Sequence, residues 1–119
     1  MTVQRGRDGV RIVAMVEALE EAKRDAAGGK EIFLKPGMPQ KAVLLDLIHL
    51  TESADKVSSG LKKLNPRIPW TRLHELRNRG LVHDYLEVDL EDLWSFVRQE
   101  APRLRRQLDR VRYPDAGPS

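Results

Sequence analysis

The sequence predicts a single all-α domain, built as an up-and-down bundle of helices. Apolar residues recur at helical spacing in three long segments, at about 7–27, 40–58 and 90–111. No stretch alternates apolar and polar residues as a half-buried strand does, and no internal repeat is present. A chain of 119 residues with 40% hydrophobic residues is typical of one core, so we expect one domain over 1–119.

The first long helix is predicted over residues 7–27, after a frayed end at about 1–6. Its apolar face comprises Ile12, Met15, Val16, Leu19 and Ala22. Gly28 and Gly29 are expected to stop it. We expect the next segment, 30–35, to be a short apolar turn that docks on the core. After a break at 35–39, Pro39 is well placed for the start of another helix.

The segment 40–58 has the strongest helical pattern in the chain. Its stripe of apolar residues, at alternating spacings of four and three, is Val43, Leu47, Leu50, Ala54 and Val57. Leu44, Leu45 and Ile48 widen this stripe beyond a single seam. An apolar arc of that width predicts burial on two sides, one against the bundle and one against a second subunit. We therefore expect a homodimer.

The second half of the chain alternates short breaks with helices. Residues 58–60 are expected to end the long helix, 61–65 to form a short turn, and 66–70 a rigid elbow with a helix starting near Pro69. His74 is predicted to lie on the outer face of that helix without a role. Asp89 is the expected N-cap of the last helical segment. Pro102 predicts either one kinked helix or two helices in line, and 114–119 is expected to be a loose tail.

Composition excludes several classes of function. Without cysteine there is no disulfide or thiolate metal site, and the three histidines lack tight ligand spacing, so no metal or cofactor is expected. No apolar run approaches a membrane span, and the first residues do not resemble a signal peptide, which favours a cytoplasmic protein. The net charge of +3 is compatible with a nucleic-acid partner. The arginine-rich stretch 98–112 is equally well interpreted as a phosphate-attracting stripe or as a solvated helix face.

Chemistry-bearing residues concentrate at 77–85. This stretch contains Arg77, Asn78, Arg79, His83, Asp84 and Tyr85. A guanidinium is a positive fork that matches phosphate oxygens, and an imidazole can exchange a proton near neutral pH. The stretch is therefore a candidate site that grips phosphate and moves protons. The alternative is an ordinary solvated face of a helix.

The chain resembles the HepT-like branch of the HEPN superfamily over nearly its whole length. Residues 48–58 resemble the family's long second helix, in which Glu52 falls at a glutamate and Thr51 replaces a glycine. Residues 65–70 resemble its Pro-x-Ile-Pro-Trp elbow. The stretch 77–85 resembles its motif of Arg followed, after four to six residues, by His-x-Tyr.

The resemblance implies a metal-independent endoribonuclease, the toxin of a toxin–antitoxin pair, with no cofactor. It would act as a homodimer whose two motifs face one another across a cleft. The implied catalytic residues are Arg77 and His83, with Asn78, Arg79, Tyr85 and Glu52 in supporting or RNA-binding roles. The implied partner is a nucleotidyltransferase antitoxin of the MNT type, which can attach AMP to the motif tyrosine, here Tyr85.

Two other functions remain open on sequence alone: an inactive binding partner of a nucleotidyltransferase with the same fold, and a helical dimerisation or adaptor protein. The spacing also departs from the commonest pattern, because five residues separate Arg77 from His83 and Gly80 is the apparent extra one. On a straight helix these two side chains would point about 120° apart. Either Arg79 takes the phosphate role, or the extra residue is absorbed locally, as a π-bulge absorbs one.

Overall fold

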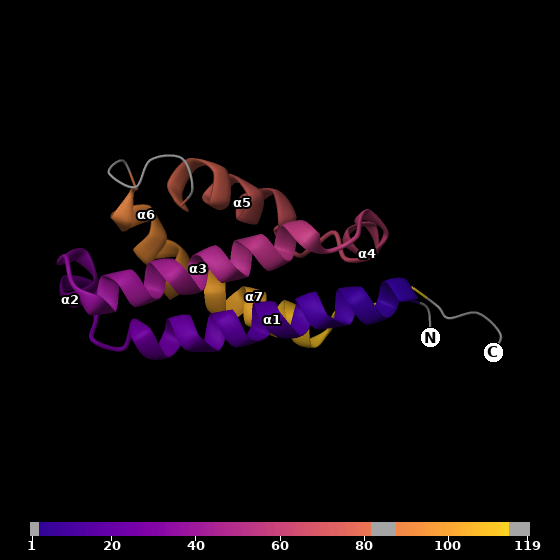
Figure 1. Cartoon of the computed structure of the whole chain (residues 1–119), viewed down its shortest axis with the longest axis horizontal. Helices are drawn as coiled ribbons and strands as arrows, with labels where there is room; N and C mark the ends of the chain where they lie inside the picture. Colours follow the sequence, from indigo (N-terminus) through magenta and orange to yellow (C-terminus); the bar gives the residue numbers. More distant parts are fainter. Residues whose placement is uncertain (1–2, 82–87, 115–119) are drawn as a thin grey trace.

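The computed structural model describes residues 3–81 and 88–114, and the part of the chain that it describes is helical without any strand. An all-α bundle was predicted, and this is confirmed (Figure 1). The elements are α1 (Val3–Asp25), α2 (Lys30–Leu34), α3 (Met38–Lys56), α4 (Ser59–Leu64), α5 (Trp70–Glu75), the π-helical turn η1 (Leu76–Leu81), α6 (Leu90–Ser95), the π-helical turn η3 (Phe96–Glu100) and α7 (Ala101–Asp109).

The two long helices α1 and α3 lie antiparallel and pack along their lengths (Figure 1). Every member of the predicted stripe on α3 is buried, from Val43 to Val57. Pro39 lies in the first turn of α3, where its missing N–H has no helical acceptor to lose. The wide apolar arc is only partly covered within one chain, since Leu44 is buried whereas Leu45 is 52% exposed.

Two segments that were predicted to be turns are short helices, α2 and α4. Gly29 has φ of 95°, a conformation that favours glycine, and it leads directly into α2, whose Phe33 is buried in the core. Residues 61–64 of the predicted turn are instead the last four residues of α4, which Ser58 caps by accepting a hydrogen bond from the Leu61 N–H. Helix α1 begins at Val3, within the segment 1–6 that was expected to fray.

The elbow at 65–70 is organised by one buried amide. Asn65 Nδ2 donates to the carbonyls of Leu61 and Arg112, and Asn65 Oδ1 accepts from the Arg112 N–H at 2.8 Å. The indole N–H of Trp70 in turn donates to the Asn65 carbonyl. These bonds fix the start of α5 against the end of the C-terminal segment, so the direction of α5 is set from both sides.

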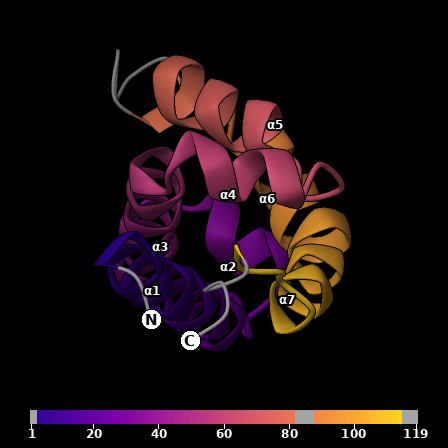
Figure 2. The ribbon, with the colours of Figure 1, turned by 90° about the vertical axis from the view of Figure 1, so that its right-hand side faces the viewer.

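Helices α6 and α7 form one helical run with the π-helical turn η3 between them. Asp89 caps the run as predicted, accepting from the Asp92 N–H. At its middle the Ala101 N–H reaches back to the Phe96 carbonyl, the five-residue step of a π-helix, just before Pro102. The run completes a ring of helices around the core when the molecule is viewed end-on (Figure 2).

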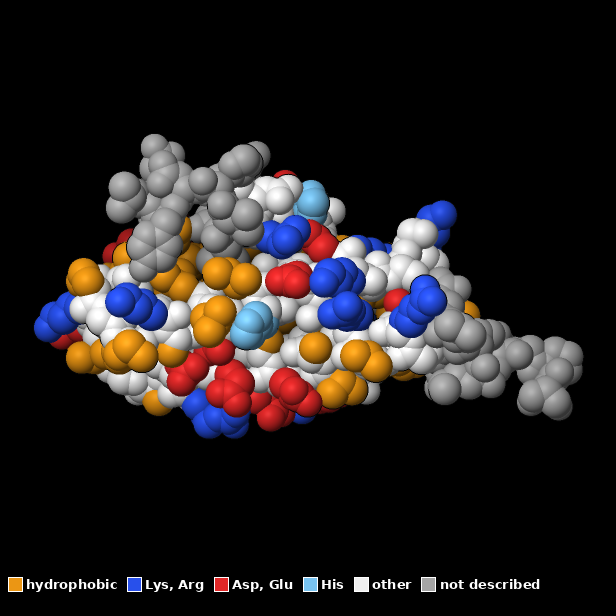
Figure 3. Space-filling model, viewed as in Figure 1, with side chains coloured by type: hydrophobic (Ala, Val, Ile, Leu, Met, Phe, Trp, Pro, Cys, Tyr) orange, Lys and Arg blue, Asp and Glu red, His pale blue; other side chains and the backbone are white. Residues whose placement is uncertain are grey.

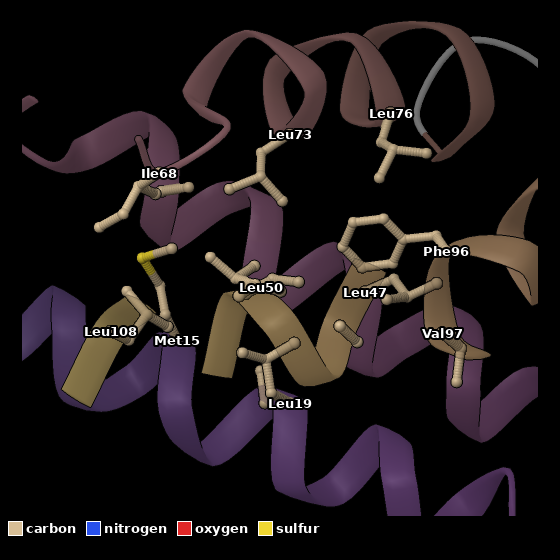
Figure 4. Packing of buried hydrophobic residues seen from close by; sticks show 14 of the residues in the cluster. Met15, Leu19, Leu47, Leu50, Ile68, Leu73, Leu76, Phe96, Val97 and Leu108 are labelled. Carbon is tan, nitrogen blue, oxygen red and sulfur yellow. The ribbon is translucent and has the colours of Figure 1, made fainter. Parts of the chain in front are cut away.

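The core lies between α1, α3, α5 and the α6–α7 run. Figure 4 shows Met15 and Leu19 of α1, Leu47 and Leu50 of α3, and Phe96 of η3 pointing into it. Leu73 and Leu76 close it from the side of α5 and are 0% and 3% exposed. The inner face of α5 is therefore anchored, and the residues that follow it are held against α3. Within the described ranges no helix has the length and apolar character that crossing a bilayer requires.

Candidate functional site

The candidate site lies where α5 runs without a break into the π-helical turn η1. Leu76 has helical dihedral angles, and η1 extends over Leu76–Leu81, so Arg77, Asn78 and Gly80 all lie within the turn. A π-helical turn is thus present at the position where local absorption of the extra residue would place one. His83, Asp84 and Tyr85 lie outside the described residues, as does the side chain of Arg79.

Arg77 is held by a carboxylate on the neighbouring helix α3. Its Nη1 donates to Asp55 Oδ2 at 3.1 Å. The side chain of Arg77 is 34% exposed and that of Asp55 is 22% exposed. Among the described residues Asp55 is the only hydrogen-bond acceptor of this guanidinium, and Arg77 Nε is buried without one. One edge of the fork is therefore fixed while other N–H groups keep their hydrogen-bonding capacity.

The same carboxylate also binds a histidine. Asp55 Oδ1 lies 3.1 Å from His74 Nδ1, and His74 Nε2 lies 2.9 Å from Asn78 Nδ2. His74, Asn78 and Arg77 belong to α5 and η1, whereas Asp55 belongs to α3. The prediction that His74 is exposed is confirmed, with its side chain 57% exposed, but it is a member of this network and not an isolated surface residue.

Glu52, a predicted supporting residue, lies one turn before Asp55 on α3 but does not contact Arg77 by a hydrogen bond among the described residues. It pairs with Lys56 at 3.1 Å. The hydrogen bond and charge of Lys56 lower the pKa of Glu52, and the charges of Arg77 and His49 lower it further. The charge of Arg77 therefore acts on Glu52, but Asp55 is the carboxylate that forms a hydrogen bond with Arg77. Asp55 was not among the site residues predicted from the sequence.

Arg72, one turn before the site, joins α5 to the C-terminal helical run. Its guanidinium donates to both oxygens of Asp92 at 3.0 and 3.2 Å and to both oxygens of Glu100 at 3.0 Å. It also lies over the ring of Phe96, 5.8 Å from the centroid. The hydrogen bonds that Arg72 donates to Glu100 and Asp92 raise its pKa. This clamp fixes the orientation of the helix that carries Arg77.

A second polar surface, the groove between α1 and α3, adjoins the site. It has a volume of about 450 Å³, and His49, Glu52 and Asp46 are among its lining residues. Burial raises the pKa of Asp46 to about 8, with further contributions from a hydrogen bond with Asp25 and from the charges of Asp25 and Glu21. Asp46 Oδ2 is buried and has no hydrogen-bond partner among the described residues. No cluster of His, Asp and Glu suited to a metal ion occurs within 3–81 and 88–114.

Viewed from outside, the face formed by α3 and α5 is a mixture of charges and apolar patches. Figure 3 shows blue and red side chains side by side over these helices, with histidine imidazoles among them and apolar side chains to either side. A phosphate approaching this face would meet arginine and histidine next to carboxylates. The arrangement can orient an anion more readily than it can attract one from a distance.

Comparisons with known proteins identify the family of the chain. The family model described as "HepT-like: Ribonuclease HepT-like" matches residues 15–111. The chain is 31% identical over 101 residues to "Probable ribonuclease HepT" of Thermococcus cleftensis, covering 85% of this chain and 89% of that protein. It is 27% identical over 79 residues to "Putative RNase MJ1380" of Methanocaldococcus jannaschii, covering 66% and 72%. No solved structure matches. The chain thus belongs to the HepT-like ribonuclease family.

Proposed function

We propose that this protein is a metal-independent endoribonuclease that acts as the toxin of a toxin–antitoxin pair in the cytoplasm. The observation that carries the proposal is the position of Arg77, which Asp55 holds at the surface in a π-helical turn of a HepT-like fold. Asn78 lies beside it, and the chain continues from this turn to His83 and Tyr85. A π-turn is a common way to present a functional side chain from within a helix.

The proposed reaction uses the nucleophile that RNA itself contains. An imidazole accepts the proton of the 2′-hydroxyl while its oxygen attacks phosphorus, and a protonated imidazole delivers a proton to the departing 5′-oxygen. Arg77 stabilises the additional negative charge of the phosphorane transition state. The products are a 2′,3′-cyclic phosphate and a 5′-hydroxyl. DNA, which lacks the 2′-hydroxyl, is not cleaved.

The direct test is incubation of the purified protein with total RNA in the presence of EDTA, with His83→Ala in parallel. The wild type should produce fragments with cyclic phosphate ends and 5′-hydroxyl ends, whereas the variant should produce none. A single-stranded DNA of the same sequence as a cleaved RNA is the matched substrate control. Cleavage that requires an added divalent ion, or equal cleavage by His83→Ala, would overturn the proposal.

We also propose that the active form is a homodimer, because Leu45, a member of the wide apolar arc of α3, is 52% exposed within one chain. Removing an apolar side chain of this size from water is favourable, and contact with a second copy of the chain would bury it. Light scattering should give twice the chain mass of 13.6 kDa. Leu45→Glu should shift the protein to a monomer and reduce cleavage, whereas Lys41→Glu, an exposed change one turn earlier on α3, should not. A wild-type monomer would contradict the composite site.

The proposed partner is a nucleotidyltransferase antitoxin of the MNT type, which would silence the site by attaching AMP to Tyr85. Tyr85 is close to Arg77 in the sequence. The added phosphodiester would bind the Arg77 guanidinium in place of the RNA phosphate. Intact-mass measurement after co-expression should show one or more AMP units on the wild type and none on Tyr85→Phe. An unmodified wild type that is nonetheless fully inhibited would indicate neutralisation by binding alone.

A further inference from the structure

The described part of the candidate site contains a histidine in addition to the motif residue. His74 precedes Arg77 by three positions, so both side chains project from the same side of the helix. Asp55 lies opposite and uses one oxygen for each of them, at 3.1 Å to His74 Nδ1 and at 3.1 Å to Arg77 Nη1. A single carboxylate thus holds an imidazole and a guanidinium next to one another.

The hydrogen-bond partners determine which nitrogen of His74 is free to react. A carboxylate only accepts, so Nδ1 must carry the proton that bonds to Asp55. Nε2 faces the amide of Asn78, which as placed donates to it, so the neutral ring presents its lone pair at Nε2. If Nε2 gains a proton, the amide can reverse and accept from it. Asn78 therefore suits both charge states of the ring.

This is the arrangement that a proton-accepting histidine requires. A carboxylate on Nδ1 fixes the tautomer, orients the ring and stabilises the imidazolium that forms when Nε2 takes a proton. The side chain of His74 is 57% exposed, so a substrate can reach Nε2 by displacing the Asn78 amide. His49, by contrast, is exposed on α3 in the neighbouring groove and makes no hydrogen bond with any described residue.

We propose that His74, oriented by Asp55 beside Arg77, is a proton-transfer residue of the ribonuclease site. The inference rests on the proposed function and adds a residue to it. Nε2 of His74 accepts the 2′-hydroxyl proton as the 2′-oxygen forms its bond to phosphorus. The bond from phosphorus to the 5′-oxygen breaks, and that oxygen takes a proton from a second, protonated group, the role proposed for His83.

The experiment compares wild type with His74→Ala, His74→Gln and the matched control His49→Ala on one RNA oligonucleotide in EDTA. Glutamine keeps an N–H donor for Asp55 but does not accept and release a proton as imidazole does. Both His74 variants should lose about 100-fold or more in kcat with KM nearly unchanged. Free imidazole should restore part of the rate of His74→Ala, whose exposed site leaves room for it. His49→Ala should cleave like the wild type, and circular dichroism should show all four proteins equally folded.

A purely structural role for His74 would give different results. If its contribution were only to brace Asp55, then His74→Gln would retain the wild-type kcat and imidazole would not rescue His74→Ala, and either result overturns the proposal. If the wild type itself does not cleave RNA, the proposed function fails and the role of His74 fails with it. If the wild type and His74→Gln both cleave RNA at the same rate, the proposed role of His74 fails and the proposed ribonuclease function stands.

Discussion

The molecule contains two π-helical turns among its described residues, and they differ in what they present. In η1 the widened turn carries Arg77 and the exposed Asn78 at the surface, within reach of Asp55 and His74. In η3 it carries Phe96 and Val97, which are 0% and 8% exposed. Leu76 of η1 is also buried and Arg98 of η3 is also exposed, so each turn has an inner and an outer side. A π-turn alone is no evidence of a site, and its side chains and their partners are what distinguish the two.

The two turns are also physically connected. Arg72 precedes η1 by four residues and binds Glu100, the last residue of η3, together with Asp92. Its guanidinium covers the ring of Phe96. The buried turn therefore serves as the support for the exposed one. Substitutions in η3 should act on stability, those around η1 on activity, and those at Arg72 on both.

The largest difference should appear on removing the main side chain of the buried turn. Phe96→Ala should lower the free energy of unfolding by about 3–5 kcal/mol, because it opens a cavity among fully buried side chains. Asn78→Ala, its counterpart in the exposed turn, should change it by less than about 0.5 kcal/mol. Urea denaturation followed by circular dichroism measures both. Equal losses would show that η1 is as structural as η3.

Breaking the anchor of the exposed turn should affect activity next most strongly. Asp55→Asn removes the charge that holds Arg77 and His74 while keeping the size of the side chain. RNA cleavage should fall by about 100-fold, because small misplacements of catalytic groups cost rate on that scale. Glu52→Gln, one turn earlier on α3, is the matched control and should keep most of the activity. If Glu52→Gln is the more damaging change, the carboxylate assignment is wrong.

Much of the fold could be predicted from the sequence, and the reasons for the exceptions are physical. The stripe on α3 depends on periodicity alone, so Val43 and Leu47 were correctly placed in the core. The start of α1 lies earlier than expected because the apolar spacing that predicts this helix begins only at Ile12. Helix α4 was missed because Ser58 was interpreted as a stop for one helix and not as a cap for the next.

The candidate site divides in the same way. A π-helical turn near Gly80 could be considered from the sequence, because the extra residue in the motif spacing is visible locally. The contacts of Asp55 with His74 and Arg77 join residues 19 and 22 positions apart. Such contacts depend on how α5 settles on α3, which no local pattern encodes. The Arg72 clamp was missed for the same reason.

The link between the turns should have a smaller effect than either turn. Arg72→Lys keeps the charge but loses the planar fork that binds two carboxylates at once. The free energy of unfolding should fall by about 1 kcal/mol, and cleavage should fall measurably as the support for η1 loosens. Arg103→Lys, an exposed position on α7, is the control. If Arg72→Lys changes stability without any change in cleavage, the two turns act independently.

A different kind of effect, one that depends on pH, lies outside both turns, at Asp46. Its folded-state pKa of about 8 exceeds the unfolded value of 3.8, so the folded state binds the proton more tightly. Stability from this group is therefore present below pH 4 and is lost as pH rises toward 8. Asp46→Asn should have a higher Tm than the wild type at pH 8.5, and the difference should shrink at pH 4. A difference that grows toward acid would contradict this assignment.

The central claim is that the π-helical turn η1 makes Arg77 the phosphate-binding arginine of a ribonuclease site. The most direct test is the cleavage rate of Arg77→Ala and Arg79→Ala on the same RNA in EDTA, with equal folding verified for both. The account predicts a loss of about 100- to 1,000-fold for Arg77→Ala, the scale of removing one transition-state donor, and less than about threefold for Arg79→Ala. Loss of activity in Arg79→Ala with an active Arg77→Ala would contradict it.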